Sequence, residues 1–432
     1  MLQRRQFVIH LLSVAAAGPA AGAATPALAP GGDLQEAIDR AARAGEPVTL
    51  GPGTFAATGL KLPDGTRLVG VPGRTRLVAA APRPIAIAEG AASLHLTGLT
   101  FDGGFQTLGA AEGIVALAGV ADLHVDSCAF TRTTGHGLRL QACAGRVERS
   151  SFTLAGQAGL FSLDASGLVV RDNRVEHCGN GGILVWRSAP GEDGTLVSGN
   201  RIARIRADAG GTGQNGNGIN FFRAGGVIAA DNRIADCAFT AIRANSASNV
   251  QMTGNQCLRS GETALYAEFA FEGALIANNL VDGAAVGISV TNFNEGGRLA
   301  VVSGNIVRNL RREGPYRADP PGFGSGIAVE ADTAVTGNVV EGAPLVGIAI
   351  GFGRWQRDVT ATGNVVRNAG IGISVSVADG AGPALVADNL IRGARSGAIV
   401  GFRGADAATG DLARGGVEAF PFLTIERNRV AG

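Results

Sequence analysis

Cysteine is scarce in this chain of 432 residues, and its spacing excludes the two structural roles that cysteine usually has. The five cysteines are an odd number, and no CxxC or CxxxH spacing occurs among them. Structural zinc sites and disulfide-stabilised folds both depend on regular, paired cysteine spacing. We therefore expect small, buried, unpaired thiols at Cys128, Cys143, Cys178, Cys237 and Cys257.

Charged residues are also sparse: they make up 17% of the chain, the net charge is +1, and neither sign is clustered. Nucleic-acid binding normally requires a basic stripe, so we expect no nucleic-acid partner. The sequence lacks a phosphate-binding loop, a dinucleotide fingerprint and an HExxH motif, which predicts no cofactor. Acidic residues do not cluster on neighbouring repeats, which predicts no metal site.

Long apolar runs are absent after the N-terminal segment. No later run reaches the about 18 apolar residues of a membrane span. The N-terminal segment itself pairs Arg4 and Arg5 with a weakly hydrophobic, alanine-rich run, which is typical of a twin-arginine signal. An ordinary secretory signal is the alternative. We expect residues 1–29 to be a signal peptide, cleaved after Ala23 or Ala29. The twin-arginine export machinery would then be a partner, and the product would be periplasmic or secreted, with no membrane anchor after cleavage.

Glycine is abundant, with 67 residues, and much of it belongs to an internal repeat. The repeat unit begins with Asn, continues through a short loop to Gly, and ends in alternating apolar residues. Its commonest period is about 23–26 residues, and the longer intervals carry polar inserts around 206–217, 311–325 and 404–420. The repeated asparagines are Asn173, Asn200, Asn232, Asn255, Asn279, Asn305, Asn338, Asn364, Asn389 and Asn428.

This period predicts short strands joined by tight turns. Each unit holds two or three apolar runs that alternate with period two, and these runs are too close together for helical crossovers. Successive coils would stack in parallel about 4.8 Å apart, which predicts an all-β, right-handed parallel β-helix of roughly a dozen coils. The repeated asparagine would lie at a corner, donate to the next coil's asparagine or to the turn backbone, and tolerate a left-handed conformation. A leucine-rich horseshoe is excluded because its L-x-x-L-x-L frame does not occur.

The residues before the repeats predict a cap. Asp33 is suited to N-cap a helix that ends at Ala44, with apolar residues on one face, and such a helix would cover the open end of the solenoid. We therefore divide the mature chain into a cap helix with the first coils, 30–90, and β-helix repeats, 91–432.

The early coils resemble a known superfamily. The stretch 52–70, with Pro-Gly-Thr-Phe followed by Leu-x-Leu-Pro-x-Gly-Thr, and the coil at 94–103 look like the start of pectate-lyase-like β-helices. Together with the arginine pair and the Asn-Gly-Ile repeats, nearly the whole chain resembles a family of twin-arginine-translocated repetitive proteins that has no assigned activity. The resemblance implies the β-helix fold and a carbohydrate-related function, the latter by analogy alone.

The outward positions of the coils predict a site. When the coils are aligned on the Gly-Ile corner, one outward line reads Val115, Arg139, Phe161, Leu184, Asn220, Arg243, Tyr266, Ser289 and Ala328. The second line reads Leu117, Gln141, Leu163, Trp186, Phe222, Asn245, Glu268, Thr291 and Glu330. The middle coils differ from the rest and are polar. We predict substrate-binding roles for Trp186, Asn217, Asn220, Phe222, Arg223, Asn245 and Asn292, and catalytic roles for Arg243, Tyr266, Glu268 and Glu330.

These residue types suit a polysaccharide of uronic or neutral sugars, because Arg can hold a carboxylate in a fork and aromatic rings cover the apolar faces of sugars. A lyase or epimerase would use Arg243 and Tyr266 as acid-neutralising group and base. A glycoside hydrolase would use Glu268 and Glu330, which share a register two coils apart, roughly 9–10 Å by the strand spacing. The Gly-His-Gly at His136 matches polygalacturonases superficially, but the paired aspartates of that family are missing, so we interpret it as a turn.

Two functional hypotheses follow from this pattern. The first is an exported β-helix protein that binds, cleaves or modifies a polysaccharide in a groove on the outer face of one sheet. The second is a non-enzymatic structural or adhesive repeat protein of the periplasm or cell envelope, whose polar sheet face is an ordinary solvated surface. The non-repetitive patch favours the first hypothesis, because a pure scaffold does not require Arg243, Tyr266 and Glu268 on neighbouring coils.

Overall fold

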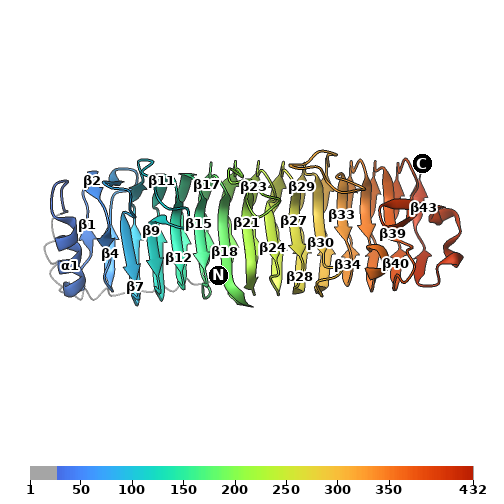
Figure 1. The fold of residues 1–432 in the computed structure, drawn as a ribbon, viewed down its shortest axis with the longest axis horizontal. Coiled ribbons are helices and arrows are strands. Elements are labelled where there is room, and N and C mark those ends of the chain that lie inside the picture. The colour runs from blue at the N-terminus through green and yellow to red at the C-terminus, as the bar shows by residue number, and fades with distance from the viewer. Residues whose placement is uncertain (1–26, 432) are drawn as a thin grey trace, which may run out of the picture.

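The computed structural model describes residues 27–431, which form an elongated solenoid with its coils stacked along one axis (Figure 1). The predicted signal peptide, residues 1–29, lies outside the described residues except for its last three. Within the described range, three sheets run the length of the solenoid, and each contains fifteen strands. Up to β42, strands three apart in the chain pair with one another, so each coil contributes one strand to each sheet. The predicted all-β parallel solenoid is confirmed.

The strands of the first sheet come directly before the corner that carries the ladder asparagine. Its strands are β1 (Val48–Thr49), β4 (Thr66–Val69), β7 (Ser93–Thr97), β10 (Asp122–Asp126), β13 (Gly145–Glu148), β16 (Val169–Arg171), β19 (Leu196–Ser198), β22 (Ile228–Ala230), β25 (Val250–Thr253), β28 (Glu272–Ala277), β31 (Arg298–Ser303), β34 (Thr333–Thr336), β37 (Val359–Thr362), β40 (Ala384–Ala387) and β44 (Leu423–Glu426).

The second sheet follows the asparagine corner. Its strands are β2 (Gly53–Ala57), β5 (Thr75–Ala79), β8 (Thr100–Asp102), β11 (Ala129–Thr133), β14 (Ser151–Ala155), β17 (Arg174–Glu176), β20 (Arg201–Ala203), β23 (Arg233–Ala235), β26 (Gln256–Leu258), β29 (Leu280–Asp282), β32 (Ile306–Arg308), β35 (Val339–Glu341), β38 (Val365–Arg367), β41 (Leu390–Arg392) and β45 (Arg429–Ala431).

The third sheet carries the predicted site. Its strands are β3 (Leu60–Lys61), β6 (Ala86–Glu89), β9 (Gly113–Ala118), β12 (His136–Gln141), β15 (Ala158–Leu163), β18 (Gly181–Glu192), β21 (Asn217–Gly225), β24 (Ile242–Asn245), β27 (Thr263–Glu268), β30 (Val286–Thr291), β33 (Ser325–Val329), β36 (Val346–Ile350), β39 (Ile371–Ser376), β42 (Ile399–Arg403) and β43 (Asp406–Asp411).

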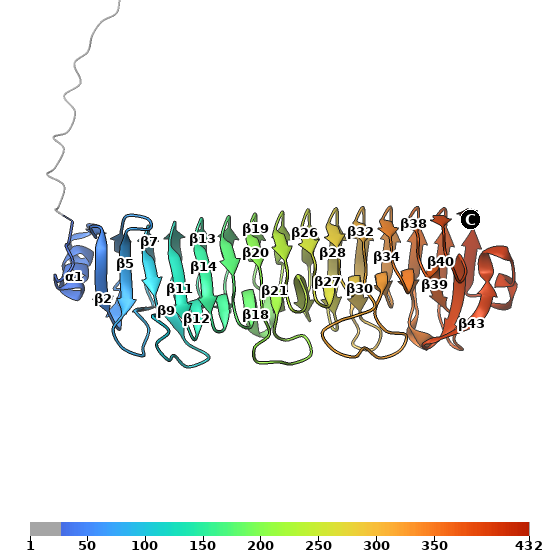
Figure 2. The same ribbon diagram turned by 90° about the horizontal axis from the view of Figure 1, so that it is seen from above.

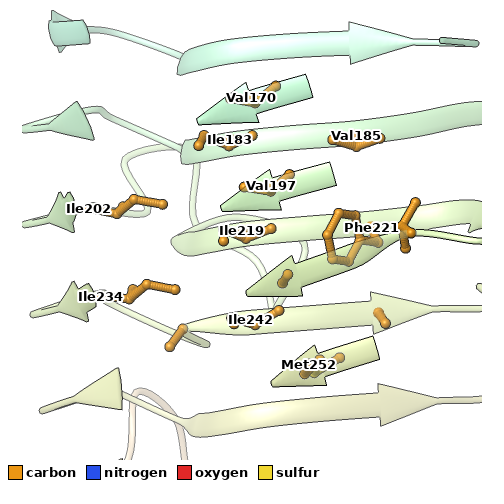
Figure 3. Packing of buried hydrophobic residues seen from close by; sticks show 14 of the residues in the cluster. Val170, Ile183, Val185, Val197, Ile202, Ile219, Phe221, Ile234, Ile242 and Met252 are labelled. Atoms are coloured by element: carbon orange, nitrogen blue, oxygen red, sulfur yellow. The ribbon is translucent and has the colours of Figure 1, made fainter. Parts of the chain in front are cut away.

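The core fills the space between the three sheets. Inward side chains of successive coils lie above one another, as Ile183, Ile219 and Ile242 of the third sheet show (Figure 3). The coil interior is also lined by Phe101, Phe130 and Phe152, whose rings stack with centroids 5.2 and 4.8 Å apart. All five cysteines are buried and unpaired, as predicted, and therefore pack as small apolar residues.

The asparagine ladder forms as predicted and is continuous from Asn173 to Asn428. In a typical rung, Nδ2 of Asn279 donates to Oδ1 of Asn305 at 3.0 Å and to the carbonyl oxygen of Met252 at 2.9 Å. The backbone N–H of Asn279 donates to the same Oδ1 at 3.0 Å. Each buried amide is thus bonded to the coils on both sides, which fixes the register at this corner.

One detail of the corner differs from the prediction. The left-handed conformation belongs to the residue before each ladder asparagine and not to the asparagine itself. That preceding residue is Asp172 (φ 57°) before Asn173 and Gly254 (φ 68°) before Asn255. The physical reason is that the ladder asparagine must direct its side chain inward along the axis, so the sharp turn is made one position earlier, by residues that tolerate positive φ.

The N-terminal cap is confirmed. Helix α1 (Leu34–Ala44) begins at N-cap Asp33, whose carboxylate accepts from the Glu36 N–H at 2.9 Å. Its buried face, formed by Leu34, Ala37 and Ile38, joins the hydrophobic core of the solenoid. The end of the core is therefore covered rather than open to solvent.

The polar inserts fold differently from one another. Two of them form loops, 204–216 between β20 and β21 and 309–324 between β32 and β33, and both leave from the corner between the second and third sheets. Figure 2 shows the longer loops gathered along one edge of the solenoid. The third insert contains β43, which pairs antiparallel with β42, and the 3₁₀ turns η2 (Leu412–Arg414) and η3 (Val417–Ala419). A third 3₁₀ turn, η1 (Gly353–Trp355), follows β36.

The ladder makes a testable prediction. Replacing Asn279 with Ala leaves buried partners on both neighbouring coils unsatisfied, so we expect it to lower the free energy of unfolding by about 2–4 kcal/mol. Asn428→Ala removes the last rung, which bonds on one side only, and should lower it by about 1 kcal/mol. Guanidinium denaturation followed by circular dichroism measures both values. Equal losses would contradict a ladder whose interior rungs hold two coils together.

Candidate functional site

The outer face of the third sheet brings together most of the predicted site residues. Strands β18, β21, β24 and β27 pair in parallel, so Asn220, Arg243 and Tyr266 occupy one register. Phe222, Asn245 and Glu268 occupy the second register, with Trp186 paired to Phe222. Because the strands are hydrogen-bonded neighbours, residues in one register lie side by side on adjacent coils.

The outward lines were predicted correctly from Arg139 onward but not before it. Val115 pairs with Leu138 and is fully buried, and Leu117 is fully buried as well, so Ala116 is the outward partner of Arg139. The error has a simple cause: Gly113 lies in register with His136, one position earlier than the corner glycine on which the coils were aligned.

Arg243 and Glu268 form a buried ion pair. The Nε of Arg243 donates to Oε1 at 2.5 Å and its Nη2 donates to Oε2 at 2.8 Å, the two-pronged geometry that guanidinium and carboxylate prefer. Asn245 Nδ2 adds a third hydrogen bond to Oε1 at 2.7 Å. The Glu268 side chain is only 1% exposed, and both of its oxygens are occupied. The predicted catalytic role of Glu268 therefore has to compete with a structural one.

Tyr266 lies beside this ion pair, with the Arg243 Cζ 5.0 Å from the centre of its ring. Burial raises the pKa of the Tyr266 hydroxyl above its ordinary value, and the hydrogen bond to Thr291 and the charge of Arg243 offset this only in part. The phenol thus keeps its proton at neutral pH, which disfavours the predicted use of Tyr266 as a base.

A second carboxylate near Arg243 was not predicted. Glu262 is 3% exposed, and its Oε2 lies 3.9 Å from Arg243 Nη1. It accepts hydrogen bonds from Thr240 Oγ1 at 3.0 Å and from the Tyr316 hydroxyl at 2.6 Å. Tyr316 comes from the loop 309–324, so the contact joins residues 54 apart in the chain. The polar insert around 311–325 predicted a loop at this place, but the sequence does not indicate that Tyr316 of this loop contacts Glu262.

A cavity opens on the outer face of the third sheet, beside the ion pair. Its volume is about 420 Å³. The floor comes from the third sheet and the roof from the loop 204–216, whose Gly213 packs so closely on Arg243 that a Cβ there would overlap Nη1. The lining residues are Trp186, Thr212, Gln214, Asn220, Phe222, Arg243, Asn245 and Phe269.

Three polar atoms on the side chains that line this cavity have no hydrogen-bond partner. They are Trp186 Nε1, Asn220 Oδ1 and Arg243 Nη1, and all three are buried. Among the described residues, eight buried side-chain nitrogen or oxygen atoms lack a partner, so three of the eight belong to one small site. Buried polar atoms in folded proteins are nearly always paired, so this cluster of exceptions is a feature that the β-helix repeat alone does not account for.

Two predicted binding residues have structural roles instead. Asn217 is fully buried, donates to the Gly213 carbonyl at 2.8 Å, and accepts from the Thr240 N–H at 3.3 Å. Asn292 donates to the carbonyls of Gly297 and Ala331, each at 2.9 Å, and accepts from Ala331 N–H. The oxygen and nitrogen of both side-chain amides thus have partners within the protein, which disfavours the predicted binding roles.

Glu330 is also separate from the cavity. Its Oε2 accepts from the backbone N–H groups of Asn292 at 2.7 Å and Phe293 at 3.0 Å. Burial raises its pKa to about 7, although the two N–H groups act in the opposite direction. Glu268 and Glu330 thus belong to different hydrogen-bond networks, and their pairing in hydrolysis stays a prediction.

Aromatic side chains continue along the outer face from the cavity. The ring of Trp186 contacts Phe161 and Phe222 edge-on, with centroids 5.3 and 5.7 Å apart. Arg223 stacks on Phe222, with Cζ 4.7 Å from the ring centre, and donates to the Ser188 carbonyl, so it lies at the rim. His136 stacks on Phe161 and accepts from the Ala158 N–H, and burial lowers its pKa to about 4. These contacts give the Gly-His-Gly segment a structural role.

The described residues offer neither a metal-binding cluster nor a membrane-spanning helix. Between residues 27 and 431 no group of three or more His, Cys, Asp or Glu side chains is placed to hold a metal ion. In the same part of the chain no helix has the length and apolar character needed to cross a bilayer.

Comparison with known families now places the chain. The family model that describes a right-handed β-helix region matches residues 89–202 and 191–355, which together make up more than half of the chain. The protein therefore belongs to this family, and the handedness predicted from the sequence is confirmed. A search among curated protein sequences finds no match.

Solved structures show the same fold. The chain is similar to the N-terminal fragment of bacteriophage phi29 gene product 12, with a TM-score of 0.54 and 14% identity over 85% of this chain and 66% of that one. For the pre-mature form of that gene product the TM-score is 0.51 and the identity 15%, over 85% of this chain and 53% of that one. The chain thus spans about half to two thirds of these relatives.

A weaker similarity extends to an epimerase. The A-module of the mannuronan C-5 epimerase AlgE6 from Azotobacter vinelandii matches with a TM-score of 0.41 and 15% identity, over 92% of this chain and 94% of that one. At such low identities, the two phage structures with TM-scores above 0.5 establish a shared fold and nothing about activity.

The buried ion pair makes a prediction about stability. Glu268→Gln leaves the Arg243 charge buried without its main partner, so we expect the free energy of unfolding to fall by about 2–4 kcal/mol. Asp236→Asn is the matched control, because Arg259 holds Asp236 in the same two-pronged way, at 2.6 and 2.7 Å, on the exposed surface. The control should lose less than about 1 kcal/mol. Chemical denaturation compares the two, and similar losses would contradict the importance of burial.

Glu330 makes a prediction about pH. Its pKa in the folded protein, about 7, exceeds its ordinary value of 4.5, so the folded state holds the proton more tightly. The associated stability is present below pH 4.5 and is lost as the pH rises toward 7. Relative to the wild type, Glu330→Gln should therefore gain about 1–3 kcal/mol of stability between these pH values. Denaturation across this range measures the difference, with Glu89→Gln as the exposed control; a pH-independent difference would contradict the raised pKa.

Proposed function

We propose that the protein binds a polysaccharide or oligosaccharide on the outer face of the third sheet, with one sugar unit seated in the cavity beside Arg243. The observation that carries this proposal is the set of three buried, unpartnered polar atoms, Trp186 Nε1, Asn220 Oδ1 and Arg243 Nη1. Aromatic walls next to a few convergent polar atoms are what a sugar-binding site requires, since sugar rings have apolar faces and polar edges.

The same geometry favours binding over turnover. Both oxygens of Glu268 are occupied by Arg243 and Asn245, and Glu262 is held by Thr240 and Tyr316. A general acid or base must be free to exchange a proton with the substrate, and an activated nucleophile must be free to attack. The lyase, epimerase and hydrolase chemistries therefore have less support here than a binding role.

A structural or adhesive role remains the second candidate, and the continuous asparagine ladder is the observation that favours it. A ladder of this length stabilises any long solenoid, whatever its outer face does. It does not account for the cavity, however, because a scaffold has no need to bury polar atoms without partners. We further propose, from the arginine pair and the apolar segment at the N-terminus, that the protein acts in the periplasm or outside the cell.

Two conservative variants test the proposal by calorimetric titration of the purified protein with a panel of neutral and acidic oligosaccharides. Trp186→Phe keeps the aromatic contacts but removes the Nε1–H donor, and Asn220→Leu removes the Oδ1 acceptor. We expect each to weaken binding about 3–10-fold, the effect of one hydrogen bond.

Folding stability provides the internal check. Because Oδ1 of Asn220 is buried without a partner, Asn220→Leu should leave the melting temperature unchanged or raise it while binding weakens. Arg139→Ala, on the same outward register but outside the cavity, is the control and should not alter the affinity. No binding to any member of the panel would refute the proposed function and favour the structural role.

A further inference from the structure

The buried charges beside the cavity do not balance, whereas the half-exposed cation at the rim, Arg223, is screened by solvent. Arg243 is the one charged side chain among the described residues that line it. That guanidinium faces two carboxylates, because Glu268 holds it from one side and Glu262 approaches Nη1 to 3.9 Å from the other. One positive and two negative charges leave this cluster with a net negative charge. All three side chains are largely buried, so water screens the imbalance poorly.

An acidic sugar is poorly matched to this arrangement. The sequence suggested that Arg243 would hold a uronate carboxylate in its fork, but the Nε and Nη2 edge that forms such a fork already holds Glu268. Nη1 alone is left, and it points to a place near a second carboxylate. A ligand carboxylate there would lose its hydration and meet two like charges for a single hydrogen bond.

The unpartnered atoms instead match hydroxyl groups. Arg243 Nη1 and Trp186 Nε1 are donors, and Asn220 Oδ1 is an acceptor. A sugar hydroxyl is both donor and acceptor and can pair with any of the three atoms, whereas a carboxylate group placed there only accepts and would leave Asn220 Oδ1 unpaired. Leaving a buried group unpaired is what makes a polar site reject the wrong ligand strongly.

We infer that the ligand is a neutral, hydroxyl-rich glycan, and that Glu262 and Glu268 exclude sugars that carry a carboxylate. This inference rests on the proposed function and specifies its substrate class. Glu262 is a specificity-determining residue in this assignment: it does not pair with the ligand but keeps the surroundings of Arg243 Nη1 negative.

The test compares pairs of oligosaccharides that differ only at C6, such as galactose oligomers and galacturonate oligomers of the same length and linkage, by calorimetric titration. We expect the neutral member of a pair to bind at least about 10-fold more tightly. Its affinity should also stay constant between roughly 50 and 500 mM salt, because no net charge is transferred on binding.

Two variants test the role of charge. Glu262→Gln keeps the shape and one hydrogen-bond acceptor but removes a negative charge, so the affinity for the acidic oligomer should rise about 3–10-fold. Thr212→Lys adds a cation to the exposed roof of the cavity and should act in the same direction without disturbing buried contacts. Gln256→Lys, on the exposed face of the second sheet, is the matched control and should have no effect.

The outcomes separate the inference from the function on which it rests. Tighter binding of the acidic oligomer, or an unchanged preference in both Glu262→Gln and Thr212→Lys, would overturn the neutral-sugar inference while leaving a glycan-binding protein. Absence of binding to either oligomer would overturn the inference together with the proposed function. The inference and the proposed function would both be supported by one pattern of results. The wild type and Gln256→Lys would prefer the neutral oligomer equally, and Glu262→Gln and Thr212→Lys would show a smaller preference.

Discussion

The stacking of each coil on the previous one, held in register by the asparagine ladder, is the constraint on which the rest of this structure depends. The ladder amides bond to the coils on both sides, so no coil can slip by a residue without breaking buried hydrogen bonds at the corner. A slip of one position would turn Arg243 and Glu268 into the core. The polar face of the third sheet therefore depends on the asparagine corner, which lies between the first and second sheets and fixes the register of every coil.

Much of this frame could be predicted from the sequence, because the repeat itself encodes it. The ladder asparagines, the capping helix at Asp33 and the outward lines from Arg139 onward all follow from local spacing. The alignment failed at Val115, because Gly113 lies one position before the register of the corner glycine of the other coils. The position of the left-handed residue was also wrong, because spacing alone does not say which of two adjacent polar residues makes the turn.

The candidate site was harder to predict for a reason of a different kind. Asn217 and Asn292 look like surface amides in the repeat, yet loops that depart from the period fold back and use all their hydrogen-bonding capacity. Glu262 was overlooked because its partners Arg243 and Tyr316 are brought to it by separate loops and coils. The repeat predicts the structure of the coils, but it does not predict the conformation of the loops inserted between them. The chemistry of the site is determined largely by those segments.

The corner between the second and third sheets has a consequence for how such a protein can change over evolutionary time. The loops 204–216 and 309–324 both leave the solenoid there, and each supplies side chains to the surroundings of Arg243. A coil contacts only its neighbours, and lengthening a surface loop adds little to the entropy lost on folding. Residues that determine ligand preference are thus largely distinct from those that determine stability. A lineage could exchange these two loops and acquire a new specificity while inheriting its architecture intact.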